Sequence, residues 1–144
     1  MGFNPHLTVA TIVEQNGRFL MVEEMQGQQL VINQPAGHLE ADESLIEAAV
    51  RETLEETGWT VRPTGVTGIY LFKAANGETY QRVCFVAEAI EHDAERDLDD
   101  GIIRATWLSL DELEARRNEL RSYLVLDCLH DYRLKPHYPL EVIR

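Results

Sequence analysis

Three glutamates lie close together in residues 37–59, a stretch with the sequence GHLEADESLIEAAVRETLEETGW. On a helix that ends near Thr57, a turn of about 100° per residue places Glu52, Glu55 and Glu56 within an arc of roughly 100°. Carboxylates gathered on so small a patch repel one another, and the repulsion raises the pKa of at least one of them. Hard divalent cations with oxygen ligands relieve this repulsion. The spacing indicates a divalent-cation site, and the alternative is an ordinary solvated acidic face of a helix.

The residues on either side of these glutamates fit the same chemistry. Arg51 and Glu55 are four residues apart, close enough to pair on a helix, and Arg51 also reaches Glu43 at the predicted helix entry. Gly37 lies in the preceding loop. A glycine there lets the backbone approach a metal ion or a phosphate closely, although a simple turn would also use one. The flanking residues therefore favour a functional site over a plain solvated helix face.

Taken together, these positions resemble the Nudix box, G-x5-E-x7-R-E-U-x-E-E-x-G-U, in which U is a bulky aliphatic residue. All seven fixed letters are present at the right spacing, as Gly37, Glu43, Arg51, Glu52, Glu55, Glu56 and Gly58. The two U positions depart from the pattern, because they hold Thr53 and Trp59. Those positions pack against the core in the family, so we expect altered packing and retained chemistry.

The resemblance implies a hydrolase that cleaves a phosphoanhydride bond in a substrate built as a nucleoside diphosphate linked to another group. Water attacks phosphorus, while divalent cations hold the phosphate oxygens and activate the water. Mg²⁺ is the expected ion, and Mn²⁺ is an expected substitute. The alternative is a non-catalytic Nudix-fold module that binds a nucleotide or a protein. The complete acid set disfavours this alternative, since a binding module has no need of a destabilising carboxylate cluster.

The match to the box also implies roles for individual residues. The expected metal ligands are, in order of preference, Glu52, Glu56, Glu55 and the carbonyl oxygen of Gly37. The general base is Glu52, Glu55 or an acid outside the box. Arg51 and Glu43 are expected to orient the carboxylates, which Arg51 also partly neutralises.

Weaker likeness extends over most of the chain. The segments QPAGHLEADESLIEAA, RSYLV and YPLEVI resemble a branch of bacterial phosphatases within the family. Those phosphatases are described as hydrolysing the thiamine-pyrimidine diphosphate and some nucleoside di- and triphosphates. The resemblance therefore implies a small phosphorylated substrate of this kind.

Cationic and aromatic side chains outside the box are candidates for binding that substrate. For its phosphate end, Arg82 comes first because its strand is expected to line the cleft, followed by Lys73, Arg18 and Arg121. A planar end requires a flat surface, and the candidates are Tyr70, Phe72, Tyr80, Phe85 and Trp107. His38, beside Gly37, is a further candidate contact. Each of these residues has a plainer alternative role in the core or on the surface. The acidic loop with Asp97, Asp99 and Asp100 is either a source of a late catalytic acid or a solvated loop.

Apolar patterning and turn residues predict the elements that position these side chains. Strands are predicted at residues 7–14, 19–22, 30–32, 66–73, 79–89 and 102–107. Hairpin turns are predicted at Asn16-Gly17 and Asn76-Gly77. Helices are predicted from Asp42 or Ser44 to about Thr57, after Ser109 and after Ser122. This order indicates one α/β (α+β) domain over residues 1–144, and the resemblance implies the Nudix fold, a mixed β-sheet sandwiched between helices.

Composition limits the partners of the chain. Its 144 residues carry a net charge of −12, which repels polyanions, so we expect no binding to nucleic acid. The longest apolar runs are too short to span a bilayer, and residues 1–6 lack the features of a signal peptide. We therefore expect a cytoplasmic protein without a membrane partner, as a monomer or a homodimer. Cys84 and Cys128 lie among apolar neighbours and are expected to be buried free thiols.

Overall fold

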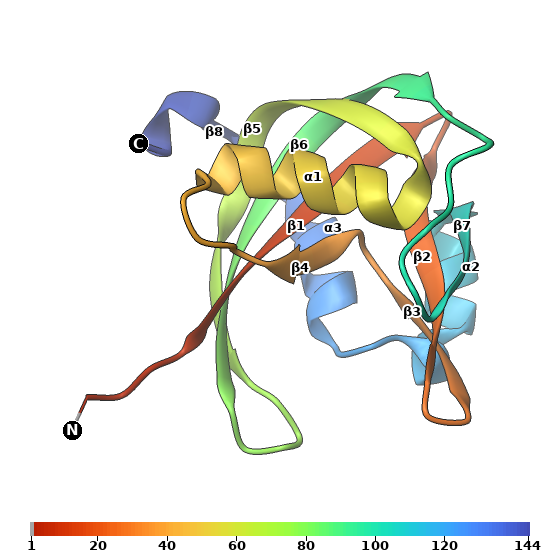
Figure 1. The fold of residues 1–144 in the computed structure, drawn as a ribbon, viewed down its shortest axis with the longest axis horizontal. Coiled ribbons are helices and arrows are strands. Elements are labelled where there is room, and N and C mark those ends of the chain that lie inside the picture. The colour runs from red at the N-terminus through yellow and green to blue at the C-terminus, as the bar shows by residue number, and fades with distance from the viewer. Residues whose placement is uncertain (1) are drawn as a thin grey trace.

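A mixed β-sheet lies between helices in the computed structural model of this chain, which describes residues 2–144 (Figure 1). Met1, which the predicted 1–144 domain includes, lies outside the described residues. The strands are β1 (His6–Gln15), β2 (Arg18–Gln26), β3 (Gln29–Asn33), β4 (Ala36–His38), β5 (Trp59–Lys73), β6 (Thr79–His92), β7 (Ile102–Ser109) and β8 (Tyr138–Pro139). The helices are α1 (Leu45–Thr57), α2 (Leu110–Ala115) and α3 (Leu124–Leu134), with short 3-10 turns at Arg117–Glu119 and Leu140–Val142. None of these helices is long and apolar enough to cross a bilayer.

The sheet combines parallel and antiparallel pairing. Its main path runs β3-β2-β1-β6-β5-β8, with β4 paired to β1 and β7 paired to β2. The β1–β6 pair is parallel, and the other pairs are antiparallel. Helix α1 covers one face of the sheet and α3 covers the other (Figure 1). These features confirm the predicted α+β class, with a mixed sheet between helices.

The side chains of β1 point alternately to the two faces of the sheet, and each face has its own apolar core. Val9 packs with Ala48 and Ala49 of α1, whereas the next residue, Ala10, packs in the cluster that includes Cys128 and Leu129 of α3. Successive strand side chains point to opposite faces, so a single buried strand serves both helices. The two cysteines are free and buried in this core, as the sequence predicted.

Helix α1 has strong start and stop signals. Ser44 is the N-cap, and its hydroxyl accepts a hydrogen bond from the Glu47 backbone N–H while the Glu47 carboxylate accepts one from the Ser44 N–H. Gly58 ends the helix at φ 76°, a left-handed conformation that glycine adopts without steric cost. Thr53 is fully buried, and its hydroxyl donates to the Ala49 carbonyl oxygen at 2.8 Å and lies 3.0 Å from the Thr11 hydroxyl. The polar residue at this U position is thus accommodated by hydrogen bonds.

Several boundaries differ from the prediction. Strand β5 begins at Trp59 instead of residue 66, because Pro63 and Gly65 interrupt the pairing with β6 at bulges and do not end it. Strand β4 was not predicted, since it has only three residues and follows Pro35. The N-cap of helix α3 is Tyr123, one residue later than the predicted cap, Ser122, whose hydroxyl accepts a hydrogen bond from the Leu124 N–H at 3.3 Å.

A buried glutamate joins β2 to β7 and to the end of α2. The Glu23 side chain is 4% exposed and forms ion pairs with Arg104 and, at 3.0 Å, with Arg116. The hydrogen bond from Arg104, followed by that from Arg116, holds the pKa of Glu23 below its usual value. The folded state therefore binds fewer protons at this site than the unfolded state does, and stability rises with pH across this range.

We expect Glu23→Gln to lower the free energy of unfolding at pH 7 by about 1–3 kcal/mol, the range for hydrogen bonds to charged groups. The deficit should be complete above the unfolded glutamate pKa of about 4.3 and should shrink as the pH falls through the lower folded pKa. Denaturant titrations of both proteins at several pH values measure this. Glu88→Gln is the control, because its pair with Arg62 is exposed on both sides. A deficit independent of pH would contradict the assignment.

Candidate active site

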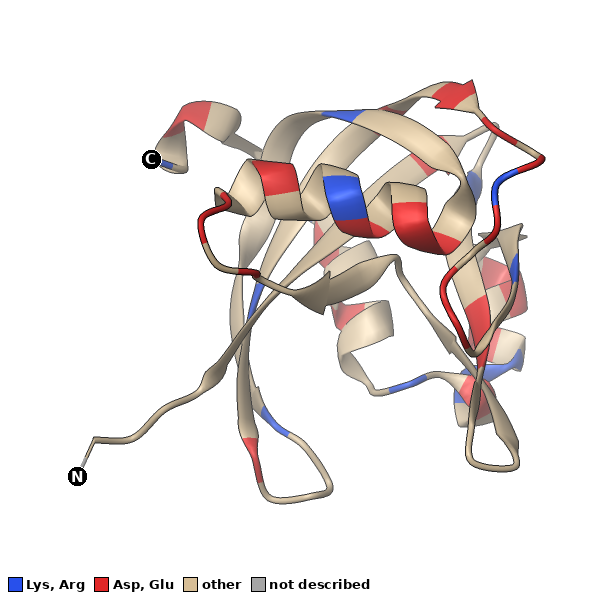
Figure 2. Ribbon diagram, in the orientation of Figure 1, with Lys and Arg blue, Asp and Glu red and all other residues tan. Residues whose placement is uncertain are grey.

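A cleft of about 810 Å³ opens beside β4 and the C-terminal half of α1. Its walls come from β4 with α1, the β5–β6 hairpin, the β3–β4 connection, the segment that precedes α3, and parts of β1 and β2. Figure 2 shows that acidic residues gather on α1 and on the loop that precedes β7, which lies beside the end of this helix. The cleft therefore has one strongly acidic wall.

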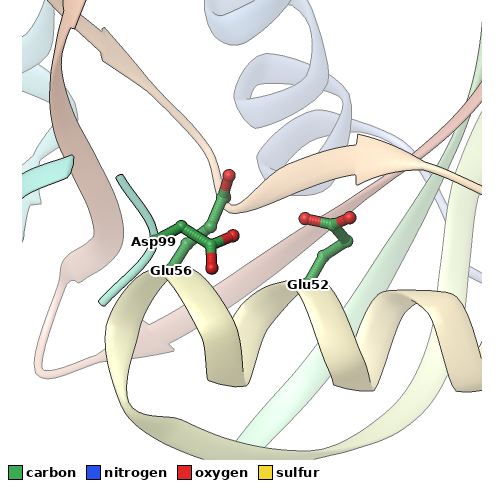
Figure 3. A group of neighbouring side chains, drawn as sticks. All are labelled: Glu52, Glu56 and Asp99. Atoms are coloured by element: carbon green, nitrogen blue, oxygen red, sulfur yellow. The ribbon is translucent and has the colours of Figure 1, made fainter. Parts of the chain in front are cut away.

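Three carboxylates on that wall converge. Glu52 and Glu56 are one helical turn apart on α1, and Asp99 comes from the loop before β7 (Figure 3). One oxygen atom of each side chain lies within 4.8 Å of the others. The Asp99 backbone N–H donates to the Glu55 carbonyl oxygen at 3.0 Å and so holds the loop against the end of α1. We call Glu52, Glu56 and Asp99 the acidic trio.

Burial makes the charge of the acidic trio unfavourable. Burial raises the pKa of Glu56 to about 8, and the nearby carboxylate of Glu52 adds to this shift. The backbone N–H of Ala36 donates to Glu56 Oε1 at 3.0 Å and opposes the shift only in part. Burial also raises the pKa values of Glu52 and Asp99. Within the described residues, Glu52 pairs with Arg51 at 2.8 Å, whereas Glu56 and Asp99 have no ion pair, so the protein balances the negative charge of the trio only in part.

Arg51 binds one acid of the trio and two acids beside it. Its Nη1 donates to Glu52 and Glu55, each at 2.8 Å, and its Nε and Nη2 donate to Glu43 at 2.9 and 2.6 Å. These hydrogen bonds lower the pKa of Glu43 to about 2. Arg51 Nη2 also donates to the His38 carbonyl oxygen at 3.1 Å, which ties the β4 loop to the helix. The network matches the orienting role expected for Arg51 and Glu43, and it holds Glu55 outside the trio.

Gly37 lies against the acidic wall because β4 contacts α1. A Cβ atom built at Gly37 would lie 2.1 Å from Glu52 Cδ and 2.3 Å from both carboxylate oxygens. The backbone of β4 and the Glu52 carboxylate are therefore in close contact. Only glycine permits this approach, as expected for a site in which the chain comes close to a ligand.

The structure brings together most of the predicted substrate contacts. The cleft is lined by Arg82, Lys73, His38, Phe72, Tyr80 and Arg121. Tyr70 does not line it, and its hydroxyl donates to Asp131 at 2.8 Å on the α3 face. Phe85 is fully buried in the core, and Trp107 packs edge-on against Trp59 at 5.6 Å between ring centroids. These three aromatic side chains therefore have structural roles.

Several lining or cluster residues were not singled out from the sequence. Asp99 was considered only as one of three acids in a loop, and its meeting with α1 depends on a tertiary contact. Gln34 and Tyr123 also line the cleft. Gln34 belongs to the QPAG segment next to the box, which was a usable signal, whereas nothing near Tyr123 in the sequence marks it.

Comparison with known proteins identifies the family. The family model described as NUDIX domain matches residues 4–128, which is most of the chain. The chain belongs to the Nudix family. The match confirms the resemblance seen in the box.

Relatives of this Nudix protein cover nearly its whole length. It is 39% identical over 141 residues to Phosphatase NudJ from Shigella boydii serotype 4 and 40% identical to Phosphatase NudJ from Escherichia coli K12, with 98% of this chain and 92% of each relative covered. A solved NUDIX hydrolase from Nitrosomonas europaea matches with a TM-score of 0.96 and 45% identity, covering 98% of this chain and 97% of that one. A MutT NUDIX hydrolase from Burkholderia pseudomallei, at 20% identity and a TM-score of 0.73, shares the fold.

These relatives confirm the predicted enzyme class. The chain is a Nudix pyrophosphohydrolase or phosphatase, a hydrolase that acts on phosphoanhydride bonds in small phosphorylated substrates. Nudix hydrolases generally use a divalent metal, and the acidic trio is the candidate site for it here.

Proposed function

We propose that this Nudix hydrolase is a Mg²⁺-dependent phosphatase of small diphosphates and triphosphates, with Mn²⁺ as a substitute ion. The proposed substrates are nucleoside di- and triphosphates and the thiamine-pyrimidine diphosphate. The single observation that supports this proposal best is the acidic trio on the wall of the cleft. Its three oxygen atoms lie within 4.8 Å of one another.

The residues present fit a hard divalent cation. Carboxylate oxygens are the ligands such ions prefer, and the trio offers three of them in one place. Burial raises the pKa of Glu56 to about 8, and no cationic side chain of residues 2–144 forms an ion pair with it. A divalent ion would supply that positive charge. Glu52, Glu56 and Asp99 would hold the ion. Glu55 and the Gly37 carbonyl oxygen are proposed as further oxygen donors nearby.

When bound, such an ion neutralises phosphate oxygens and lowers the pKa of a water molecule toward neutrality. The chain's own residues do the rest. Arg51 fixes the carboxylates of Glu52 and Glu55 through its two hydrogen bonds of 2.8 Å, so both are held in place before substrate arrives. Water attacks phosphorus and the anhydride oxygen leaves with the bonding electron pair. The proton of the attacking water goes to an acid of this group, for which Glu52, Glu55 and Asp99 are the candidates.

Removing the metal should abolish activity and change the fold little. We expect release of phosphate from the proposed substrates with Mg²⁺ or Mn²⁺ and none with EDTA. The melting temperature should fall by only a few degrees, because the apolar core on each face of the sheet is built without the ion. The first effect is measured on a panel of nucleoside di- and triphosphates, thiamine-pyrimidine diphosphate and dinucleotides, as release of phosphate, pyrophosphate or nucleoside monophosphate. Thermal unfolding measures the second effect. Absence of turnover on the whole panel, or unfolding at room temperature in EDTA, would contradict the proposal.

A further inference from the structure

A buried arginine lies in the cleft together with a buried glutamine. Arg82, on β6, is 5% exposed, and Gln34, in the β3–β4 connection, is 1% exposed. Both line the same cleft as the acidic trio. Arg82 Nη1 donates to Gln34 Oε1 at 2.7 Å, which fixes the guanidinium group relative to the cleft. We call these two residues the donor pair.

The donor pair has unused hydrogen-bond donors. Arg82 Nε and Gln34 Nε2 are both buried, and neither has a hydrogen-bond partner within residues 2–144. A buried donor without an acceptor lowers stability. Two such donors on adjacent side chains, both in the lining of the cleft, indicate that the missing acceptor comes from a molecule bound there.

The charge of Arg82 is also unbalanced. Among the described residues, no carboxylate oxygen lies within 4.0 Å of its guanidinium group, although Arg51 and Arg116 each pair with at least two carboxylates. A buried cation without a counter-ion is strongly unfavourable, and a well-packed apolar side chain of similar volume would be more stable at this position. Since the guanidinium fork matches the oxygens of a phosphate, an anionic ligand of this kind satisfies both the charge and the free donors.

From these contacts we propose that Arg82, positioned by Gln34, binds oxygens of a phosphate group of the substrate other than the one that water attacks. The inference rests on the proposed function and deepens it, since it makes the donor pair a determinant of affinity for diphosphates. The acidic trio, with its cation, and the donor pair then hold a diphosphate from two parts of one cleft. Arg82 is the contact residue, and Gln34 is a positioning residue.

The first experiment measures binding without turnover. Methylenediphosphonate, a diphosphate analogue whose P–C–P linkage is not hydrolysed, is titrated into the protein by calorimetry in the presence of Mg²⁺. We expect Arg82→Met to raise its Kd roughly ten- to hundredfold, the range for a lost hydrogen bond to a charged group. Arg62→Met removes the same charge from an exposed pair outside the cleft and should leave the Kd unchanged. Equal Kd values for these two variants would overturn the inference. A parallel titration uses inorganic phosphate, the reaction product. If Arg82→Met weakens phosphate binding as much as analogue binding, the site binds any phosphate group; if phosphate binding is unchanged, the site is specific for the diphosphate.

The second experiment separates ligand binding from a structural role and also serves if Arg82→Met fails to fold. Gln34→Glu has nearly the same shape and gives Arg82 the carboxylate that it lacks. We expect this variant to be at least as stable as the wild type, while its Kd for methylenediphosphonate and its KM for substrate rise about tenfold and kcat changes little. A purely structural Arg82 predicts the gain in stability with no loss of binding, and that result would overturn the inference.

A control is needed for the added negative charge. Asn76→Asp places a carboxylate on the exposed turn of the β5–β6 hairpin at the rim of the cleft, without contact to Arg82. Its effect on the Kd should be about threefold at most, because an exposed charge is screened by solvent and salt. If the inference is wrong, the donor-pair variants bind the analogue normally and the wild type still shows metal-dependent turnover. If the proposed function is wrong, the wild type itself shows no turnover.

Discussion

Replacing Glu56 or Glu52 with glutamine is expected to lower kcat by at least a hundredfold while the fold stays intact. Both side chains belong to the acidic trio, and glutamine keeps their shape but removes the negative charge that holds a cation. A metal ion contributes several kcal/mol of charge stabilisation in the transition state, and each 1.36 kcal/mol corresponds to a factor of ten. The amide oxygen at position 56 can still accept the hydrogen bond from the Ala36 N–H, so packing is retained.

Thermal unfolding distinguishes this effect from damage to the fold. Because Glu56 is a buried acid whose charge is disfavoured, we expect Glu56→Gln to melt at the same temperature as the metal-free wild type or slightly higher. Glu47→Gln is the matched control on the same helix, since Glu47 is exposed and glutamine also serves in a capping box. Its activity should equal that of the wild type. Full activity in both Glu52→Gln and Glu56→Gln would remove the trio from the mechanism.

The parts of the site that lie on α1 could be predicted because they depend on local sequence. Helical spacing alone places Glu52 and Glu56 one turn apart, and Ser44 and Gly58 determine where the helix begins and ends. The i,i+4 pairing of Arg51 with Glu55 was likewise visible in the sequence and is present in the structure. Signals of this kind need no knowledge of the rest of the fold.

The parts contributed by distant segments could not be predicted in this way. Asp99 joins the trio through one backbone hydrogen bond to the end of α1, and nothing in its loop distinguishes it from Asp97 or Asp100. Gln34, just after β3, and Arg82, near the start of β6, meet at the same cleft although they lie 48 positions apart in the sequence. Strand periodicity predicts which face a side chain occupies, but it does not predict which strands are neighbours. Sequence patterns therefore predicted the α1 part of the acidic wall and Arg82 as a cleft residue, but they did not predict the contacts of Asp99 and Gln34.

Replacing Gly37 with alanine is expected to lower kcat by about a hundredfold, acting through Glu52. The added Cβ would lie 2.1 Å from Glu52 Cδ, so the carboxylate must turn away or β4 must separate from α1. Overpacking of this kind typically lowers the free energy of unfolding by about 1–3 kcal/mol. An unfolding experiment therefore measures the strain separately from the change in kcat. The conformation of Gly37 is one that other residues adopt, so the effect comes from lack of space.

A double-mutant cycle tests whether Gly37→Ala lowers kcat through the Glu52 carboxylate. In the Glu52→Gln background the carboxylate that Gly37→Ala displaces has already lost its charge, so the second change should lower kcat by no more than about threefold. Steady-state kinetics of the wild type, the two single variants and the double variant give the coupling directly. Losses that multiply independently would mean that alanine at position 37 acts on another group. Strong coupling would instead support the view that β4 and α1 form one unit, in which a glycine backbone holds the space that the glutamate and its ion require.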